Sequence, residues 1–328
     1  MKKMRKYIII TTINKKTVGV KKFEKSNDWN LLVIGDEKSH KIKSSNNLTF
    51  FSIEEQNKLG FQFSKKCPLN HYSRNNIGYI YAIKNNATMI FETDDDNIPY
   101  NNWFAPFSIL EKECEVIVAP KFVNIYSLFT DKHIWPRGFP LNKIKKQEKI
   151  KSKKFQSKQV AIIQGLADKD PDVDAIYRMI DGEIVYFKKR NPVILNNNVY
   201  CPFNSQNTLW HKEAFVYLYL PISVSFRFTD ILRGYIAQKG IWALGKNLAF
   251  ISPTVYQKRN EHNLMDDFSS EINCYLKVEK VVEILDKLIL SGTPLNDIRN
   301  IYTELNKNKI VNSLELEALD AWIKDISN

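Results

Sequence analysis

Short apolar runs alternate with amphipathic stretches over the first hundred residues. Residues 7–13 (YIIITTI), 30–34 (NLLVI) and 88–91 (TMIF) are short, apolar and mostly β-branched, which predicts buried strands. Between the first two, residues 17–25 have the spacing of an amphipathic helix. A strand, a helix and a strand within about 30 residues form a βαβ unit. This region therefore predicts an α/β sheet domain of the nucleotide-binding kind.

The same patterns continue along the rest of the chain. They predict helices at 52–59, 72–84 and 228–239 and strands at 115–119, 159–163 and 248–252. After residue 263 the apolar positions follow helical spacing only, and Gly292 ends one of these helices shortly before Pro294. We therefore predict a sheet domain over residues 1–263 and a helical C-terminal extension over residues 264–328.

The composition is that of an ordinary globular protein. Of 328 residues, 44% are hydrophobic and 26% are charged. No apolar run approaches the roughly 18 residues of a membrane-spanning helix, and the run that follows the basic N-terminus is too short for a signal peptide. The four cysteines lack the spacing of a zinc site. These features predict a cytoplasmic protein without an anchor.

The positive charge is concentrated in one stretch. The chain has 48 Lys plus Arg against 36 Asp plus Glu, a net charge of +12, and residues 143–158 contain eight lysines and one acid. One interpretation is a solvated loop. Another is the flexible edge of a lid that attracts an anionic acceptor or makes peripheral contact with an anionic membrane surface. Since no nucleic-acid-binding module is recognisable, we expect no nucleic-acid partner.

The strongest local signal is three consecutive acids, Asp94, Asp95 and Asp96, directly after an apolar strand. Ligands of open α/β sheets bind at the carboxyl ends of the strands, and a divalent cation relieves the repulsion between such carboxylates. Asp94 and Asp96 alternate as in a DxD motif that clamps a metal-bound diphosphate. The alternative is a solvated turn.

The motifs of other nucleotide sites are absent from the sequence. No GxxxxGK[ST] loop, GxGxxG, GxSxG or HExxH occurs. Phosphate binding by a glycine-rich loop is therefore not expected. A metal ion that joins carboxylates to a diphosphate, helped by Arg and Lys, is the remaining common solution, and it favours a sugar nucleotide as ligand.

A second acidic cluster has a carboxylate at every other position, from Asp168 to Asp174. It is not a calcium-binding loop, because Val173 stands where that loop needs glycine. Asp172 or Asp174 can cap the following helix, or these carboxylates can bind sugar hydroxyls.

Two more segments carry candidate chemistry. Asp230 is either a first-turn helix acid or a general base, with Arg233 one turn further orienting it or contacting phosphate. Near residue 260, Arg259 and His262 lie in a polar segment that suits a diphosphate and its metal.

Nine sequence blocks, in order along the chain, resemble the STELLO family of probable glycosyltransferases. They are TTIN (11–14), VIGD (33–36), NHYSRNNIGYIYAI (70–83), FETDDDN (91–97), WPRGFPL (135–141), GLADKDPDVDAIYRM (165–179), PFNSQNTL (202–209), SFRFTDILRGYIAQ (225–238) and QKRNEHN (257–263). The acidic strand end and the later D-I-x-x-G helix are more distantly similar to the reversibly glycosylated polypeptides, which include UDP-arabinopyranose mutases.

The resemblance implies a GT-A-like nucleotide-diphospho-sugar transferase fold, a mixed and mostly parallel sheet flanked by helices, with a helical C-terminal appendage. It implies that the nucleotide faces Thr11, Thr12, Asn14, Asp36, Arg74 and Asn75, and that Arg137, in WPRGFPL, closes over the donor. Mn²⁺ or Mg²⁺ would be held by Asp94, Asp96 and His262, and Asp95 would support the ribose or the metal. Asp172 and Asp174 would bind the donor sugar, and Asp174 is also a candidate catalytic residue. The acceptor would face Asn204, Ser205 and Gln206, Arg259 would bind the diphosphate, and Asp230 would be the base.

Three functional hypotheses follow. The first is a metal-dependent glycosyltransferase that moves a sugar from a UDP-linked donor to a glycan or another hydroxyl acceptor with inversion. The second is a sugar-nucleotide mutase or self-glycosylating protein. The third is a non-catalytic scaffold of a glycan-synthesis complex, which the many acids expected in one cleft argue against. The sequence predicts no oligomeric state.

Overall fold

The computed structural model describes residues 5–109, 113–119, 121–145, 150–156, 159–259 and 263–327. Within these residues one sheet of eleven strands crosses the molecule in the order β3-β2-β1-β4-β10-β8-β11-β9-β6-β7, and β5 pairs with β11. The strands are β1 (Lys6–Thr12), β2 (Asn30–Gly35), β3 (Leu48–Phe51), β4 (Met89–Thr93), β5 (Asn97–Pro99), β6 (Glu113–Val118), β7 (Lys151–Gln156), β8 (Val160–Asp168), β9 (Val193–Leu195), β10 (Asn207–His211) and β11 (Asn247–Gln257).

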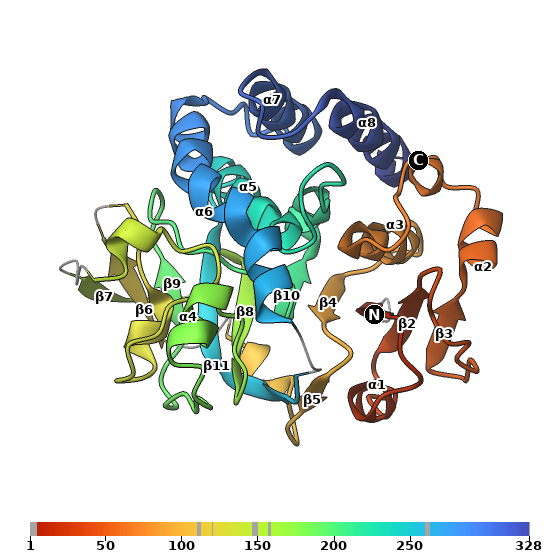
Figure 1. Cartoon of the computed structure of the whole chain (residues 1–328), viewed down its shortest axis with the longest axis horizontal. Coiled ribbons are helices and arrows are strands. Elements are labelled where there is room, and N and C mark those ends of the chain that lie inside the picture. Colours follow the sequence, from red (N-terminus) through yellow and green to blue (C-terminus); the bar gives the residue numbers. More distant parts are fainter. Residues whose placement is uncertain are drawn as a thin grey trace.

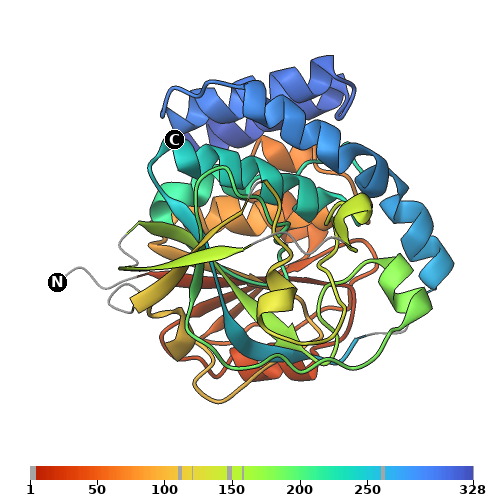
Figure 2. The ribbon, with the colours of Figure 1, turned by 90° about the vertical axis from the view of Figure 1, so that its left-hand side faces the viewer.

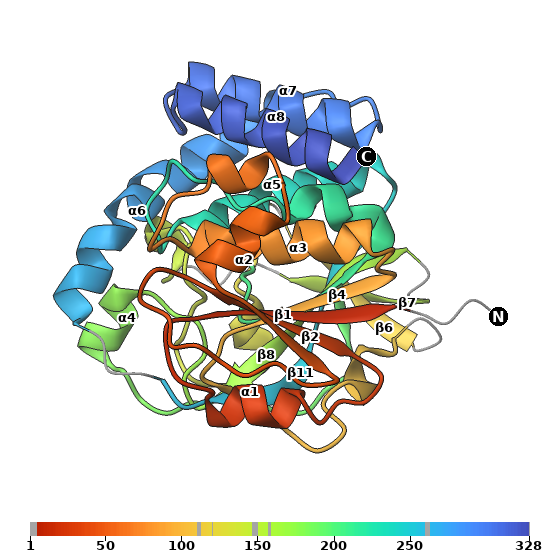
Figure 3. The ribbon, with the colours of Figure 1, turned by 90° about the vertical axis from the view of Figure 1, so that its right-hand side faces the viewer.

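Helices cover both faces of this sheet (Figures 1 and 3). Helix α1 lies on one face, whereas α3 and α5 lie on the other, beneath an outer layer formed by α7 and α8. The helices are α1 (Val18–Phe23), α2 (Ile53–Lys58), α3 (Asn75–Lys84), α4 (Ala175–Ile180), α5 (Thr229–Ala243), α6 (Leu264–Lys287), α7 (Pro294–Lys307) and α8 (Ser313–Ser327). Alternate side chains of β1 show why two layers form, because Ile8 and Ile10 join one buried cluster and Ile9 joins the other.

The strand directions create one shared edge for polar residues. β1 pairs in parallel with β2 and β4, so these three strands end together at Thr12, Gly35 and Thr93. β10 then runs antiparallel between β4 and β8. Following the pairings across the sheet, β5, β6, β9 and β10 run opposite to the other seven strands. The mixed, mostly parallel sheet with flanking helices and a helical tail agrees with the predicted fold class.

Buried carboxylates tie the helical tail to the sheet domain. Asp325 of α8 accepts hydrogen bonds from the backbone amides of Gln62 and Phe63 at 3.0 and 2.8 Å. Glu315, also in α8, accepts from the amides of Ile222 and Ser223 before α5. The helix α6 begins at Leu264, where the second domain was predicted to start, and its amino-terminal part lies beside α4 (Figure 2).

Part of the lysine-rich stretch is an edge strand, which corrects the expectation of a loop there. Residues Lys151–Gln156 form β7, which pairs antiparallel with β6 at the end of the sheet. Lys151 and Lys153 are exposed, and exposed lysines on an edge strand discourage pairing with another chain. Lys146, Lys149 and Lys158 lie outside the described residues, and among those described no helix is long and apolar enough to cross a membrane.

Candidate active site

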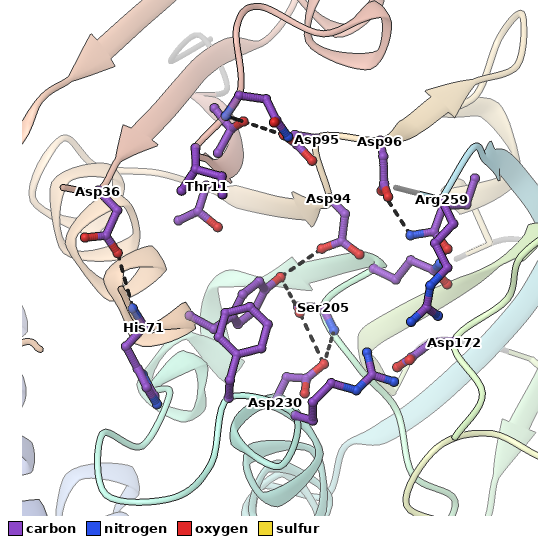
Figure 4. A pocket seen from close by; sticks show the side chains of 18 of the residues that line it. Thr11, Asp36, His71, Asp94, Asp95, Asp96, Asp172, Ser205, Asp230 and Arg259 are labelled. Atoms are coloured by element: carbon purple, nitrogen blue, oxygen red, sulfur yellow. Dashed lines mark hydrogen bonds between the residues drawn. The ribbon is translucent and has the colours of Figure 1, made fainter. Parts of the chain in front are cut away.

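A cavity of about 660 Å³ opens where β1, β2 and β4 end (Figure 4). Gln257 at the end of β11, Arg259 just beyond it, and Phe226 and Arg227 before α5 complete its wall. The structure brings together at this cavity most of the residues that the sequence analysis singled out: Thr11, Thr12, Asn14, Asp36, Asp94, Asp95, Asp96, Arg137, Asp172, Ser205, Gln206, Asp230 and Arg259. The edge shared by parallel strands thus gathers side chains that are far apart in the sequence.

Asp94 and Asp96 approach the cavity from the turn after β4. The Tyr72 hydroxyl donates to Asp94 Oδ1 at 3.0 Å, and Gln257 Nε2 donates to Asp96 Oδ1 at 3.0 Å. Burial raises the pKa of Asp94 well above its usual value, and the neighbouring carboxylates of Asp96 and Asp172 raise it further. A cation bound here would relieve that repulsion.

Asp95 lies between these two acids and faces the end of β1. Its Oδ2 atom accepts hydrogen bonds from the Thr12 hydroxyl and from Asn14 Nδ2, the latter at 2.9 Å. Helix α1 packs closely against the same turn, since a Cβ atom on Gly19 would lie 2.1 Å from the carbonyl oxygen of Asn97. The acidic turn is therefore fixed by β1 and α1, and the donors of Thr12 and Asn14 are already used on Asp95.

Arg137 joins two further carboxylates of the cavity, those of Asp172 and Asp230. Its Nε and Nη2 atoms donate to the two oxygens of Asp172 at 2.8 and 2.7 Å. Its Nη1 and Nη2 atoms also donate to the two oxygens of Asp230 at 3.0 and 2.9 Å. Although burial opposes ionisation, the Arg137 charge lowers the pKa of Asp230 below its usual value. Asp230 is thus an ionised carboxylate at neutral pH.

A chain of hydroxyl groups connects Asp230 with Asp94. Ser205 Oγ lies 3.3 Å from Asp230 Oδ2 and 2.6 Å from the Tyr72 hydroxyl, which donates to Asp94. Tyr72 also contacts Phe226, whose side chain is 50% exposed at the cavity wall. No role for Tyr72 was predicted from the sequence. Its position in the NHYSRNN block, close to Arg74 and Asn75, is the feature that could have indicated a place in the site.

At the end of β2, Asp36 organises the neighbouring loop. Its carboxylate accepts from the backbone amides of Asn70 and His71 at 2.9 and 3.2 Å. Arg74 and Asn75, predicted to face the nucleotide, lie elsewhere. Arg74 is buried and donates through Nε and Nη2 to the side-chain oxygen of Gln56, and Asn75 is buried at the start of α3. Neither residue lines the cavity.

Three more predicted residues, Arg233, Asp174 and Asn204, do not line the cavity and have hydrogen-bond partners outside its lining. Arg233 is fully buried and forms a two-point ion pair with Glu92 of β4, with both distances at 2.7 Å. Asp174 caps α4 by accepting from the Tyr177 amide at 2.8 Å, and it also accepts from Trp135 Nε1 at 2.6 Å.

Asn204 accepts a hydrogen bond from the side-chain amide of Gln164 in β8, and it lies behind Ser205 and Gln206 instead of in the wall. His262, predicted as a metal ligand, lies outside the described residues.

The carboxylate arrangement fits a divalent cation only together with a ligand. Among the described residues no group of three or more His, Cys, Asp or Glu side chains is arranged to hold a metal ion. Mg²⁺ and related cations are commonly bound by one or two carboxylates plus substrate phosphates and water. Asp94 and Asp96 match that donor set, because both carboxylates come from the turn after β4 and line the same cavity.

The chain is similar to two curated proteins of Arabidopsis thaliana. It is 29% identical over 300 residues to the probable glycosyltransferase STELLO1. The aligned region covers 85% of this chain and 38% of STELLO1. The probable glycosyltransferase STELLO2 is also 29% identical over 300 residues, covering 85% of this chain and 39% of STELLO2. The chain thus spans about two fifths of the length of these relatives. The resemblance indicated by the sequence blocks is confirmed over most of the chain.

Two other comparisons add little. No family model matches the sequence. A solved structure titled as that of a mycobacterial protein overlaps 84% of this chain and 74% of its own, with 9% identity and a TM-score of 0.41, which is too loose an overlap to support a functional argument.

Proposed function

From this relationship to the STELLO proteins, we propose that the chain is a metal-dependent glycosyltransferase. In this proposal it moves a sugar from a UDP-linked donor to a hydroxyl group of an acceptor, with inversion. The observation that carries the proposal is the single cavity at the carboxyl ends of the strands, in which the acid pair Asp94 and Asp96 lies across from Asp230. That edge is where ligands of open α/β sheets bind.

The two ends of the cavity suit different parts of a sugar nucleotide. Thr11 and Asp36 lie at one end in Figure 4, and Asp172 and Arg259 lie at the other, with Asp94 between them. We place the nucleoside against the ends of β1 and β2. The diphosphate then lies near Asp94 and Asp96, and the transferred sugar lies towards Asp172.

In this proposal the acid pair would hold a divalent cation. Asp94 and Asp96 would bind Mn²⁺ or Mg²⁺ together with the diphosphate. When bound, the cation supplies charge neutralisation for the departing diphosphate. The Tyr72 hydrogen bond keeps Asp94 oriented and favours its ionised form.

Asp230 takes the acceptor proton in this mechanism. The acceptor oxygen forms a bond to the anomeric carbon while the bond from that carbon to the phosphate oxygen breaks, and the electron pair leaves with the diphosphate. The hydroxyl proton passes to the Asp230 carboxylate. Because Asp230 is ionised beside Arg137, it is in the form that a base needs, and taking up a proton weakens its contact with Arg137.

Metal-dependent nucleotide binding is the direct test. Calorimetry with UDP should show binding that requires Mn²⁺ or Mg²⁺ and disappears with EDTA, and the double variant Asp94→Ala/Asp96→Ala should lose it. Asp131→Ala is the matched control, since this exposed acid pairs with Lys188 away from the cavity. Absence of metal-dependent binding to any nucleotide diphosphate, or binding that survives the double variant, overturns the proposal.

The transfer step needs its own experiment. Incubation with labelled UDP-sugar and no acceptor should release UDP slowly by hydrolysis and leave the protein unlabelled. Label attached to the protein would instead favour self-glycosylation.

A further inference from the structure

Three arginines lie at the end of the cavity that is away from the proposed nucleoside. Arg178 comes from α4, Arg227 from the turn before α5, and Arg259 from the segment after β11, and all three line the cavity. Arg178 and Arg227 flank Asp172, because they donate to the carbonyl oxygens of Pro171 and Val173 at 2.9 and 3.4 Å. Figure 4 places Arg259 beside Asp96 and near Asp172. We name these three residues the arginine cluster.

Carboxylates from behind the cavity wall hold the arginine cluster in place. Asp267 and Glu271, both from α6, are 7% and 0% exposed. Asp267 pairs with Arg259 at 2.6 Å, and Glu271 pairs with Arg227 Nη2 at 2.5 Å. Asp267 and Glu271 are buried and are not part of the lining, whereas all three arginines line the cavity together with Asp172, which pairs with Arg137.

The arginine cluster retains capacity for an anion. Arg178 pairs with Asp170 at 3.1 Å, yet its Nε atom is buried and has no hydrogen-bond partner among the described residues, and its side chain is only 9% exposed. A buried donor without an acceptor is costly and is rare in folded proteins. Burial, and then repulsion from Arg178 and Arg227, lowers the pKa of Arg259 to about 10. An anion bound at the arginine cluster would reduce the repulsion between these arginines.

We propose that the arginine cluster binds a phosphate or carboxylate group of the acceptor, so that the enzyme glycosylates an anionic acceptor. This inference rests on the proposed function, which puts the nucleoside at Thr11 and Asp36 and the transferred sugar towards Asp172. The acceptor, which bonds to that sugar, then lies at the same end. Paired N–H donors of guanidinium groups match the geometry of phosphate and carboxylate oxygens.

The test is calorimetry on the full chain saturated with UDP and Mg²⁺, using inorganic phosphate and neutral glucose as probes. Phosphate should bind at least about tenfold more tightly than glucose, since each charge-assisted hydrogen bond contributes this much. The variants Arg178→Gln and Arg259→Gln should each weaken phosphate binding about tenfold and change UDP affinity by less than about twofold. Arg227→Gln is avoided, because it would leave the fully buried Glu271 without its arginine, whereas Asp267 keeps Arg227 at 3.8 Å when Arg259 is replaced.

Arg299→Gln is the matched control, because Arg299 pairs with Asp320 on the exposed surface of α7 and α8. It should leave both affinities unchanged. Phosphate binding no tighter than that of glucose overturns the proposal, and so does an equal loss of UDP affinity in the cavity variants, which would assign the arginine cluster to the diphosphate.

A charged donor sugar is tested separately. UDP-glucuronate binding more tightly than UDP-glucose, with that difference lost in Arg178→Gln and Arg259→Gln, would place the anion on the donor and overturn the acceptor assignment. If the wild-type chain binds no UDP, the proposed function fails. Phosphate binding that is lost in the same variants would still support an anion site at the arginine cluster.

Discussion

Arg137 and Asp230, 93 positions apart in the chain, meet in a buried two-point ion pair, with Nη1 to Oδ1 at 3.0 Å and Nη2 to Oδ2 at 2.9 Å. The same guanidinium also donates two hydrogen bonds to Asp172. One arginine from WPRGFPL therefore sets the position of two carboxylates from two other segments. Arg137 is therefore a positioning residue, which orients the carboxylates of Asp172 and Asp230.

If Asp230 is the base, Asp230→Asn should lower the rate of UDP release about a hundredfold or more, because the amide cannot take a proton. UDP affinity should change by less than about twofold, since the residue does not hold the nucleotide in this proposal. Turnover assayed by UDP release, beside calorimetry, measures both. Asp286→Asn is the control, because this carboxylate pairs with Lys121 at the surface. Wild-type turnover in Asp230→Asn would exclude Asp230 as the base.

Tyr72→Phe should weaken binding of the cation in the presence of UDP by about tenfold at most. This fold-change corresponds to the free energy that one hydrogen bond to a charged group contributes. The Tyr72 hydroxyl favours the ionised form of Asp94, and its loss raises the pKa of Asp94 further. Calorimetry with Mn²⁺ checks this. Tyr100→Phe removes a similar hydroxyl-to-carboxylate bond, to Asp168 at 2.8 Å, outside the cavity, and should leave cation binding unchanged. Equal losses in both variants would contradict a specific role for Tyr72.

Arg233→Met should cost about 3 to 5 kcal/mol of unfolding free energy, because it leaves Glu92 as an uncompensated buried charge. Urea denaturation measures the loss. Arg299→Met breaks an exposed pair with Asp320 and should cost about 1 kcal/mol or less. A variant at Arg233 that kept its stability but lost turnover would instead support the catalytic role predicted from the sequence.

Asp174 should make folding depend on pH. Burial raises its pKa from 3.8 to about 6, although hydrogen bonds from Tyr177 and Trp135 oppose the shift. The folded state thus holds the proton more tightly than the unfolded chain, so this contribution is fully present below pH 3.8 and is lost as the pH rises through about 6. Relative to Asp174→Asn, the wild-type chain should lose up to roughly 3 kcal/mol between these limits.

Urea denaturation of both proteins at several pH values measures the difference. A wild-type advantage that grows with pH would contradict the raised pKa of Asp174.

The acidic strand end was predictable because two local signals coincide there. An apolar run such as TMIF indicates a buried strand, and the residues after a parallel strand reach the ligand-binding edge. The structure has β4 over Met89–Thr93 with Asp94 at that edge. The polar residues of β1 and β2 follow the same rule.

Long-range pairing was not predictable from such local patterns. In the sequence, Arg233 cannot be distinguished from a surface arginine of an amphipathic helix. It is nevertheless buried in the core, where it pairs with Glu92, 141 positions away. The short β10 (Asn207–His211) mixes polar and apolar residues, and only its neighbours β4 and β8 make it a strand. Arg137 gave no local sign that it would join two acids.

The buried acids of α6 change how related sequences should be judged. Asp267 and Glu271 touch no proposed ligand, and both lie beyond the last recognisable block of the sequence, yet they anchor Arg227 and Arg259 from behind. A homologue could keep every residue of the nine blocks and still lose the orientation of its arginines through a change in this helix. Completeness of motifs is therefore a poor guide to whether such a protein is active, and the counter-charges on α6 should be compared as well.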